Sequence, residues 1–182
     1  SLKDLIKERG RLPVSVVLPI AKQLCRALEV SHEEGVIHRD IKPQNMVVQS
    51  DGVLKVMDFG IARLATRPKD SGHTEAGMVV GTPEYMAPEQ LLGDELDARA
   101  DLYSTGAVLY ECLTGQVPIT ADSAIVLITR VLEQIPKPPR DVVPDVPQSL
   151  SDLVMWVLQK DREKRPASAA ALHRLLDEIA LT

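Results

Sequence analysis

Two polar segments, separated by a predicted β-hairpin, constrain this chain more than any other feature of its sequence. The first segment, residues 38–45, reads His-Arg-Asp-Ile-Lys-Pro-Gln-Asn, and the second, residues 58–60, reads Asp-Phe-Gly. Between them lie two β-prone runs, residues 46–49 and 53–57, which are joined by Ser-Asp-Gly. An Asp-Gly step between such runs is typical of a hairpin turn. The hairpin therefore predicts that the two polar segments meet at one end of the fold.

The same hairpin predicts a place where a metal ion could bind. Folding the chain back about Asp51 and Gly52 places Asn45 opposite Asp58. Opposed residues of an antiparallel pair lie about 4.5–5.5 Å apart between their Cα atoms. Amide and carboxylate oxygens are ligands that magnesium accepts. Capping of a turn at the hairpin end is the plain alternative for both residues.

Apolar spacing predicts a mainly α-helical domain around the hairpin. Helices are expected over residues 2–8, from Pro13 to near Gly35, and over residues 101–113, 121–133, 150–160 and 167–180, the last with Pro166 near its first position. Residues 101–113 carry apolar side chains on almost every face, which predicts a fully buried central helix. Residues 62–80 predict a long mobile loop, and the prolines between 136 and 147 an extended surface connection.

Composition indicates a globular intracellular protein and excludes several classes. The chain is 45% hydrophobic and 26% charged, which is typical of one soluble domain. Its net charge of −5 offers no basic surface for nucleic acid, and no segment reads as a membrane span or a signal peptide. Cys25 and Cys112 fall in helical patterns without metal or redox spacing, so we expect reduced core residues, with a structural disulfide as the alternative. A cytoplasmic location follows as an expectation.

Taken together, these motifs resemble the C-terminal, large lobe of Ser/Thr protein kinases. Residues 38–45 resemble the catalytic loop, residues 58–60 the metal-binding motif, and Ala-Pro-Glu at 87–89 the end of the activation segment. Gly-Thr-Pro-Glu-Tyr-Met at 81–86 is similar to the stretch that receives the substrate, and this region leans toward the bacterial eukaryotic-like kinases. The resemblance covers nearly the whole chain. It implies an incomplete kinase domain over residues 1–182, mainly α with a small hairpin at the catalytic loop, whose activation segment spans about 58–89.

The resemblance implies chemical roles for individual residues. Asp40 would accept or orient the proton of a substrate hydroxyl, and Lys42 would bind and neutralise the transferred phosphoryl group. Turn capping by the aspartate and a solvated lysine are the alternatives. Asn45 and Asp58 would hold Mg²⁺, and Val47 would form the floor under the adenine of ATP, although a core valine explains that position nearly as well.

Regulatory roles are implied for residues in and around the activation segment. Arg39 would pair with a phosphate on that segment, for which Thr74 is the first candidate acceptor, with Thr66 and Ser71 behind it. An unmodified polar loop residue is the alternative for each of them. Thr82 would brace the catalytic aspartate and lysine and would favour hydroxyl substrates.

Structural roles are implied for a further set of residues. His38 is expected to pack in the core rather than act as a base, and Phe59 to act as a packing switch rather than a ligand. Glu89 and Arg165 resemble a buried ion pair between the activation segment and a late helix. Asp101 would tether the catalytic loop from the buried helix. Such residues matter for folding, because removal of one partner of a buried pair costs about 3–5 kcal/mol.

The sequence lacks the motifs of the family's small lobe, because no Gly-x-Gly occurs and the lysines before residue 38 fall on helical patterns. Phosphoryl transfer depends on positioning by both lobes, so the parent is expected to be an active Ser/Thr kinase that uses ATP and Mg²⁺ on protein substrates, and this chain alone to be inactive. A catalytically silent binding module and a different magnesium phosphotransferase or hydrolase are the alternatives. The apolar face around Val47, Met57 and Phe59, which would meet the missing small lobe, is expected to be exposed and to favour self-association.

Overall fold

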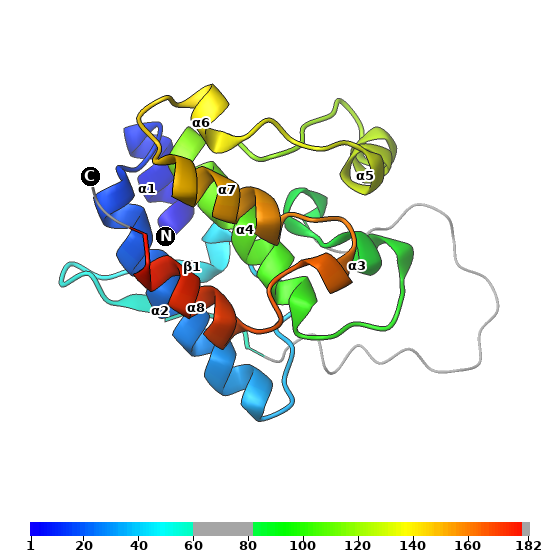
Figure 1. Cartoon of the computed structure of the whole chain (residues 1–182), viewed down its shortest axis with the longest axis horizontal. Helices are drawn as coiled ribbons and strands as arrows, with labels where there is room; N and C mark the ends of the chain where they lie inside the picture. Colours follow the sequence, from blue (N-terminus) through cyan, green and yellow to red (C-terminus); the bar gives the residue numbers. More distant parts are fainter. Residues whose placement is uncertain (60–81, 180–182) are drawn as a thin grey trace.

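Two long helices, α2 (Val14–Glu33) and α4 (Arg99–Thr114), form the centre of the computed structural model, which describes residues 1–59 and 82–179. Helix α2 packs against α8 (Ala169–Asp177) and against α4, and α4 packs against α7 (Gln148–Val157), as Figure 1 shows. The remaining elements are α1 (Leu2–Arg9), η1 (Pro43–Asn45), β1 (Met46–Val48), β2 (Leu54–Val56), η3 (Pro83–Tyr85), α3 (Pro88–Leu92), α5 (Ala124–Glu133), α6 (Pro139–Val142) and η4 (Arg162–Lys164). The prediction of a mainly helical, kinase-like large lobe with one small hairpin is confirmed.

Helix α4 is buried along nearly its whole length, as its sequence predicts. Every residue from Ala100 to Leu113 is buried, including the carboxylates of Asp101 and Glu111. Both carboxylates accept hydrogen bonds from other elements, which is what a buried charged group requires. Helix α4 is therefore a central packing element that also supplies hydrogen-bond acceptors to the loops around it.

The β-hairpin forms where the sequence predicts it, but its register differs by one residue. Strands β1 and β2 pair antiparallel with Met46 opposite Val56. Beyond the strands, the N–H of Gln49 donates to the carbonyl of Val53 at 2.9 Å, so the loop spans residues 50–52. Gly52 takes the left-handed position at the end of this loop, with φ of 84°. The glycine therefore closes a longer loop than the two-residue Asp-Gly turn that we expected.

This register corrects the predicted pairing at the open end of the hairpin. The N–H of Met57 donates to the carbonyl of Asn45 at 2.8 Å, so Asn45 lies opposite Met57 and not opposite Asp58. Asp58 follows immediately and has φ of 63°, which is uncommon for a residue other than glycine. The backbone thus turns sharply at the carboxylate that the sequence singles out.

A glutamine on helix α2 fixes the hairpin against the helical core. The Oε1 atom of Gln23 accepts a hydrogen bond from the N–H of Leu54 at 2.9 Å, and its Nε2 donates to the carbonyl of Gly52 at 3.0 Å. Because both bonds go to the backbone of the second strand and its turn, they hold the hairpin in one position on α2. An isolated two-stranded hairpin is only marginally stable, and this attachment supplies part of what it lacks.

Several helix boundaries differ from the sequence prediction, each for a local reason. The connection that was predicted as extended contains the short helix α6, because Pro139 can occupy a first helical position. Pro166 lies before the cap of α8 and not in its first turn, since Ser168 caps the helix by accepting from the N–H of Ala171 at 3.1 Å. Similarly, Ser123 caps α5, which begins at Ala124 rather than at residue 121.

The core forms one cluster that includes both cysteines. Cys25 on α2 and Cys112 on α4 are buried and free, so the prediction of reduced core residues is confirmed and the disulfide alternative is not realised. Across the described residues, none of the helices combines the length and the apolar character that crossing a bilayer requires.

Candidate active site

The segment 38–45 is attached to helix α4 through the carboxylate of Asp101. Its Oδ2 accepts from the N–H of His38 and its Oδ1 from the N–H of Arg39, both at 2.8 Å. The Nε2 of His32, on α2, lies 2.8 Å from the same Oδ2. Arg39 has φ of 70°, a conformation that costs a side chain of this size free energy and that persists only where neighbours hold it. Asp101 thus fixes the backbone next to Asp40.

The imidazole of His38 joins the two polar segments. Its Nδ1 lies 3.3 Å from the N–H of Asp40, which can only donate, so Nδ1 accepts and Nε2 carries the proton. That Nε2 donates to the carbonyl of Met57 at 2.9 Å. The ring also packs edge-on against Phe59, with centroids 4.6 Å apart. Both nitrogens of this buried histidine are therefore engaged, which leaves neither for proton transfer.

The carboxylate of Asp40 is oriented by two donors on one of its oxygens. Lys42 Nζ and Asn45 Nδ2 both lie 2.9 Å from Oδ2. The same Asn45 Nδ2 lies 2.9 Å from the backbone carbonyl of Asp40, which fixes the amide with its oxygen directed elsewhere. Within residues 1–59 and 82–179, Oδ1 of Asp40 has no hydrogen-bond partner, and the side chain is 43% exposed. Among these residues, one oxygen is therefore held while the other remains available as a hydrogen-bond acceptor.

Lys42 connects this carboxylate to the region that precedes α3. Its Nζ donates to the hydroxyl of Thr82 at 3.3 Å, while it also contacts Asp40. The lysine side chain is only 18% exposed, so its ammonium group is confined to the space between the two. The structure thus brings Asp40, Lys42 and Thr82 together, as the resemblance to protein kinases implies.

Asn45 and Asp58 supply oxygens that fit magnesium. The amide oxygen of Asn45 and the exposed carboxylate of Asp58 have no hydrogen-bond partner among the residues that the structure describes. Those residues contain no cluster of three or more His, Cys, Asp or Glu side chains able to hold a metal. Magnesium binds commonly through one or two protein oxygens, with water and substrate phosphate completing its shell. The donor set suits that ion better than zinc, which takes several nitrogen or sulfur ligands.

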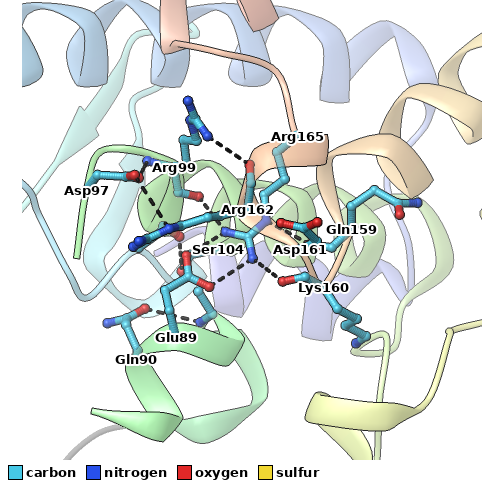
Figure 2. A network of polar contacts seen from close by, with 12 residues as sticks. Glu89, Gln90, Asp97, Arg99, Ser104, Gln159, Lys160, Asp161, Arg162 and Arg165 are labelled. Carbon is cyan, nitrogen blue, oxygen red and sulfur yellow. Dashed lines mark hydrogen bonds and ion pairs between the residues drawn. The ribbon is translucent and has the colours of Figure 1, made fainter. Parts of the chain in front are cut away.

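Glu89 and Arg165 form a buried ion pair, shown in Figure 2. The guanidinium donates to both carboxylate oxygens of Glu89, at 2.6 and 2.8 Å. It also donates to three backbone carbonyls, those of Arg99, Gln159 and Lys160. This network fixes α3 against the loop that follows α7.

Four contacts that could not be foreseen from the sequence hold the same region. Lys3 on α1 donates to the buried carboxylate of Glu111, to which the hydroxyl of Tyr85 also donates at 2.6 Å. His32 contacts Asp101, as described above, and Gln90 on α3 donates to a backbone carbonyl in the segment 38–45. All four contacts join residues far apart in sequence, and no local pattern marks them.

The remaining sequence-predicted residues lie on or directly after the hairpin, or outside the described residues. Val47, Met57 and Phe59 are 36%, 49% and 39% exposed, so an apolar face is open beside the hairpin. Thr66, Ser71 and Thr74, the candidate phosphate acceptors, fall outside the described residues, as does the predicted loop 62–80. The pairing of Arg39 with a phosphate therefore stays a prediction.

Together, these residues supply the groups that metal-assisted phosphoryl transfer requires: an oriented carboxylate, a confined ammonium group and oxygens for magnesium.

Residues 1–176 match the family model for the protein kinase domain. A probable serine/threonine-protein kinase of Clostridium perfringens is 41% identical over 179 residues, which are 98% of this chain and 26% of that protein. A probable serine/threonine-protein kinase PknB of Bifidobacterium longum is 42% identical over 170 residues, 93% of this chain and 24% of that protein. PknB of Mycobacterium tuberculosis is 38% identical over 174 residues, 94% of this chain and 27% of that protein.

The chain therefore belongs to the protein kinase family, and its relatives include bacterial Ser/Thr kinases. It spans about a quarter of the length of these curated relatives.

Proposed function

We propose that this chain provides the large-lobe half of a Ser/Thr protein kinase, which transfers the γ-phosphoryl group of ATP to hydroxyl groups of proteins. The observation that carries the proposal is the set of contacts around Asp40. One of its oxygens is held by Lys42 and Asn45, while the other has no hydrogen-bond partner among residues 1–59 and 82–179, and the side chain is partly exposed. The bacterial relatives named as Ser/Thr kinases support the same reaction.

In this proposal Asp40 acts on the hydroxyl group of the acceptor. Its second oxygen, Oδ1, would accept the hydroxyl proton and aim the oxygen atom of the acceptor at the phosphorus. Lys42, held between Asp40 and Thr82, would contact the transferred phosphoryl group and offset its charge. Thr82 would keep the lysine in place next to the position of the acceptor.

Asn45 and Asp58 would hold magnesium through their oxygens that have no hydrogen-bond partner in residues 1–59 and 82–179, and Val47 would lie beneath the adenine of ATP. When bound, magnesium would neutralise phosphate charge and orient the phosphates. His38 would keep the Asp58 segment in register with the Asp40 segment, since its ring contacts both. The activation segment, from about 58 to 89, would carry the regulatory threonines or serine, and Arg39 would pair with a phosphate on one of them.

We further propose that residues 1–182 act in a cytoplasmic kinase domain whose small lobe covers Val47, Met57 and Phe59. Support comes from the exposure of these apolar side chains and from the absence of any Gly-x-Gly in the sequence. The chain by itself would then transfer phosphate negligibly, and its open apolar face would favour self-association at high concentration. Protein substrates bearing Ser or Thr would be its natural acceptors.

The proposal is tested by phosphate transfer from radiolabelled ATP and magnesium to casein, measured for the full-length protein and for the 182-residue chain. In the full-length protein, Asp40→Asn should lower kcat by about 10²- to 10⁴-fold, the usual contribution of a general base. Asp122→Asn, at an exposed position on the surface, is the matched control and should leave the rate unchanged. Equal activity of wild type and Asp40→Asn would refute the proposed role, and ATP hydrolysis without transfer to any protein would indicate a different phosphotransferase or hydrolase.

A further inference from the structure

We propose that Gln90 is a positioning residue that holds Asp40 in place through the backbone of Arg39. This inference rests on the proposed function, because it concerns the geometry of the proposed catalytic carboxylate. Gln90 lies on α3, directly after Glu89, and its Nε2 donates to the carbonyl oxygen of Arg39 at 2.8 Å. The two residues are far apart in the chain, so the bond is a tertiary contact and not a local turn.

The first argument comes from the backbone of Arg39. Its φ of 70° is a left-handed conformation, which carries a cost of about 1–3 kcal/mol when a residue other than glycine adopts it. Such a conformation persists when the surroundings hold it on more than one side. Asp101 holds the N–H of Arg39 from α4, and Gln90 holds its carbonyl from α3. Asp40 is the next residue, so the direction of its side chain depends on both bonds.

The second argument concerns the orientation of the Gln90 amide. The N–H of Ala87 donates to Oε1 of Gln90 at 3.1 Å, and a backbone N–H can bond only to an acceptor. The carbonyl of Arg39 can bond only to a donor, which Nε2 supplies. Both partners therefore require the same orientation of the amide, with its oxygen toward Ala87 and its nitrogen toward Arg39. A reversed amide would place Nε2 against the N–H of Ala87, two donors, and Oε1 against the carbonyl of Arg39, two acceptors.

The third argument is the position of Gln90 between two parts of the fold. Figure 2 shows the carboxylate of Glu89 directed toward Arg165, whereas the side chain of Gln90 points away from that ion pair. Glu89 thus fixes α3 to the loop after α7, and Gln90 extends from the fixed helix to the catalytic segment. Any displacement of the start of α3, where the activation segment ends, would pass to Arg39 and Asp40 through this amide.

A plain structural role is the competing explanation, since a glutamine at the third position of a helix often caps the first backbone N–H. Two variants separate the two bonds. Gln90→Glu keeps the acceptor for Ala87 but loses the donor to Arg39. Gln90→Lys keeps a donor within reach of Arg39 but loses the acceptor for Ala87. Each variant loses one hydrogen bond, so both should lose similar stability, whereas only Gln90→Glu releases the catalytic segment.

The experiment uses the full-length protein, magnesium-ATP and casein, with Gln148→Glu on the exposed side of α7 as the matched control. We expect Gln90→Glu to lower kcat by about threefold to tenfold, the factor for one ordinary hydrogen bond, with KM for ATP nearly unchanged. Gln90→Lys and Gln148→Glu should keep kcat near that of the wild type. Hydrogen exchange should be faster across residues 38–45 in Gln90→Glu than in Gln90→Lys.

Equal kcat values and equal exchange in the two Gln90 variants would overturn the inference, whether both match the wild type or both fall together with the melting temperature. The proposed function fails in a different way, because wild-type protein would then show no transfer to casein. In that case the exchange measurement still decides whether Gln90 holds the segment 38–45.

Discussion

Arg165→Lys removes the guanidinium group of a buried ion pair but keeps the positive charge. The loss in the free energy of unfolding follows from the number of hydrogen-bond donors that each side chain offers. The guanidinium of Arg165 makes five hydrogen bonds, two to the carboxylate of Glu89 and one each to the carbonyls of Arg99, Gln159 and Lys160. An ammonium group has three protons, so at least two of these acceptors lose their donor. Each buried acceptor left unpaired costs about 1–3 kcal/mol. With two acceptors unpaired and the lysine still charged beside Glu89, we expect the free energy of unfolding to fall by about 2–6 kcal/mol.

Urea unfolding of the chain, followed by tryptophan fluorescence, measures this loss. Trp156 is the only tryptophan, and its indole N–H donates to the carbonyl of Lys164 at 2.6 Å, directly beside Arg165. Arg174→Lys, at an exposed position on α8, is the matched control and should change stability by no more than about 0.5 kcal/mol. If Arg165→Lys lost no more than this control, with the same slope against urea, the reasoning from unpaired acceptors would be wrong.

Two further predictions use the same unfolding assay. Gly106→Ala places a Cβ 2.9 Å from Val157 Cγ1 and 3.2 Å from Leu158 Cδ2. We expect a net loss of stability, because a steric cost of about 1–3 kcal/mol exceeds the gain in helix propensity of roughly 1 kcal/mol. An unchanged urea midpoint would mean that α7 moves aside at no cost in stability. Burial, and then the charge of Arg165, lower the pKa of Lys160 from 10.5 to about 8. The folded state therefore binds fewer protons than the unfolded state between these pH values, so the stability of the wild type should rise over that range relative to Lys160→Met, and parallel profiles of the two proteins would contradict the shift.

The sequence predicts the helices of this fold well, because their apolar spacing reports directly which face is buried. Helix α4 is the clearest case, since apolar residues on every face can only mean burial on every face. The hairpin shows where such reasoning stops. Ser-Asp-Gly at residues 50–52 is compatible with two loop lengths, and the choice depends on Gln23 of α2 and on Gly52 taking the left-handed position. The shift of one residue in the hairpin register could therefore not be predicted from the local sequence pattern.

The candidate site was predictable to the extent that its residues lie close together in the chain. Asp40, Lys42 and Asn45 share one loop, and the structure brings their side chains together. The contacts of His32 and Gln90 were not predictable, because a histidine or a glutamine in a helix carries no sign of a partner on another element. Their identification needed the distances to Asp101 and to the carbonyl of Arg39.

The attachment of the catalytic segment to Asp101 sets a lower limit on any piece of this protein that could be transplanted into a designed scaffold. Residues 38–59 contain Asp40, Lys42, Asn45 and Asp58, yet the carboxylate that receives the N–H groups of His38 and Arg39 lies on α4. A peptide of residues 38–59 would leave both N–H groups to water and would let the backbone relax to an ordinary conformation. A recipient scaffold must therefore present a buried acid at the position of Asp101, besides accepting the loop itself.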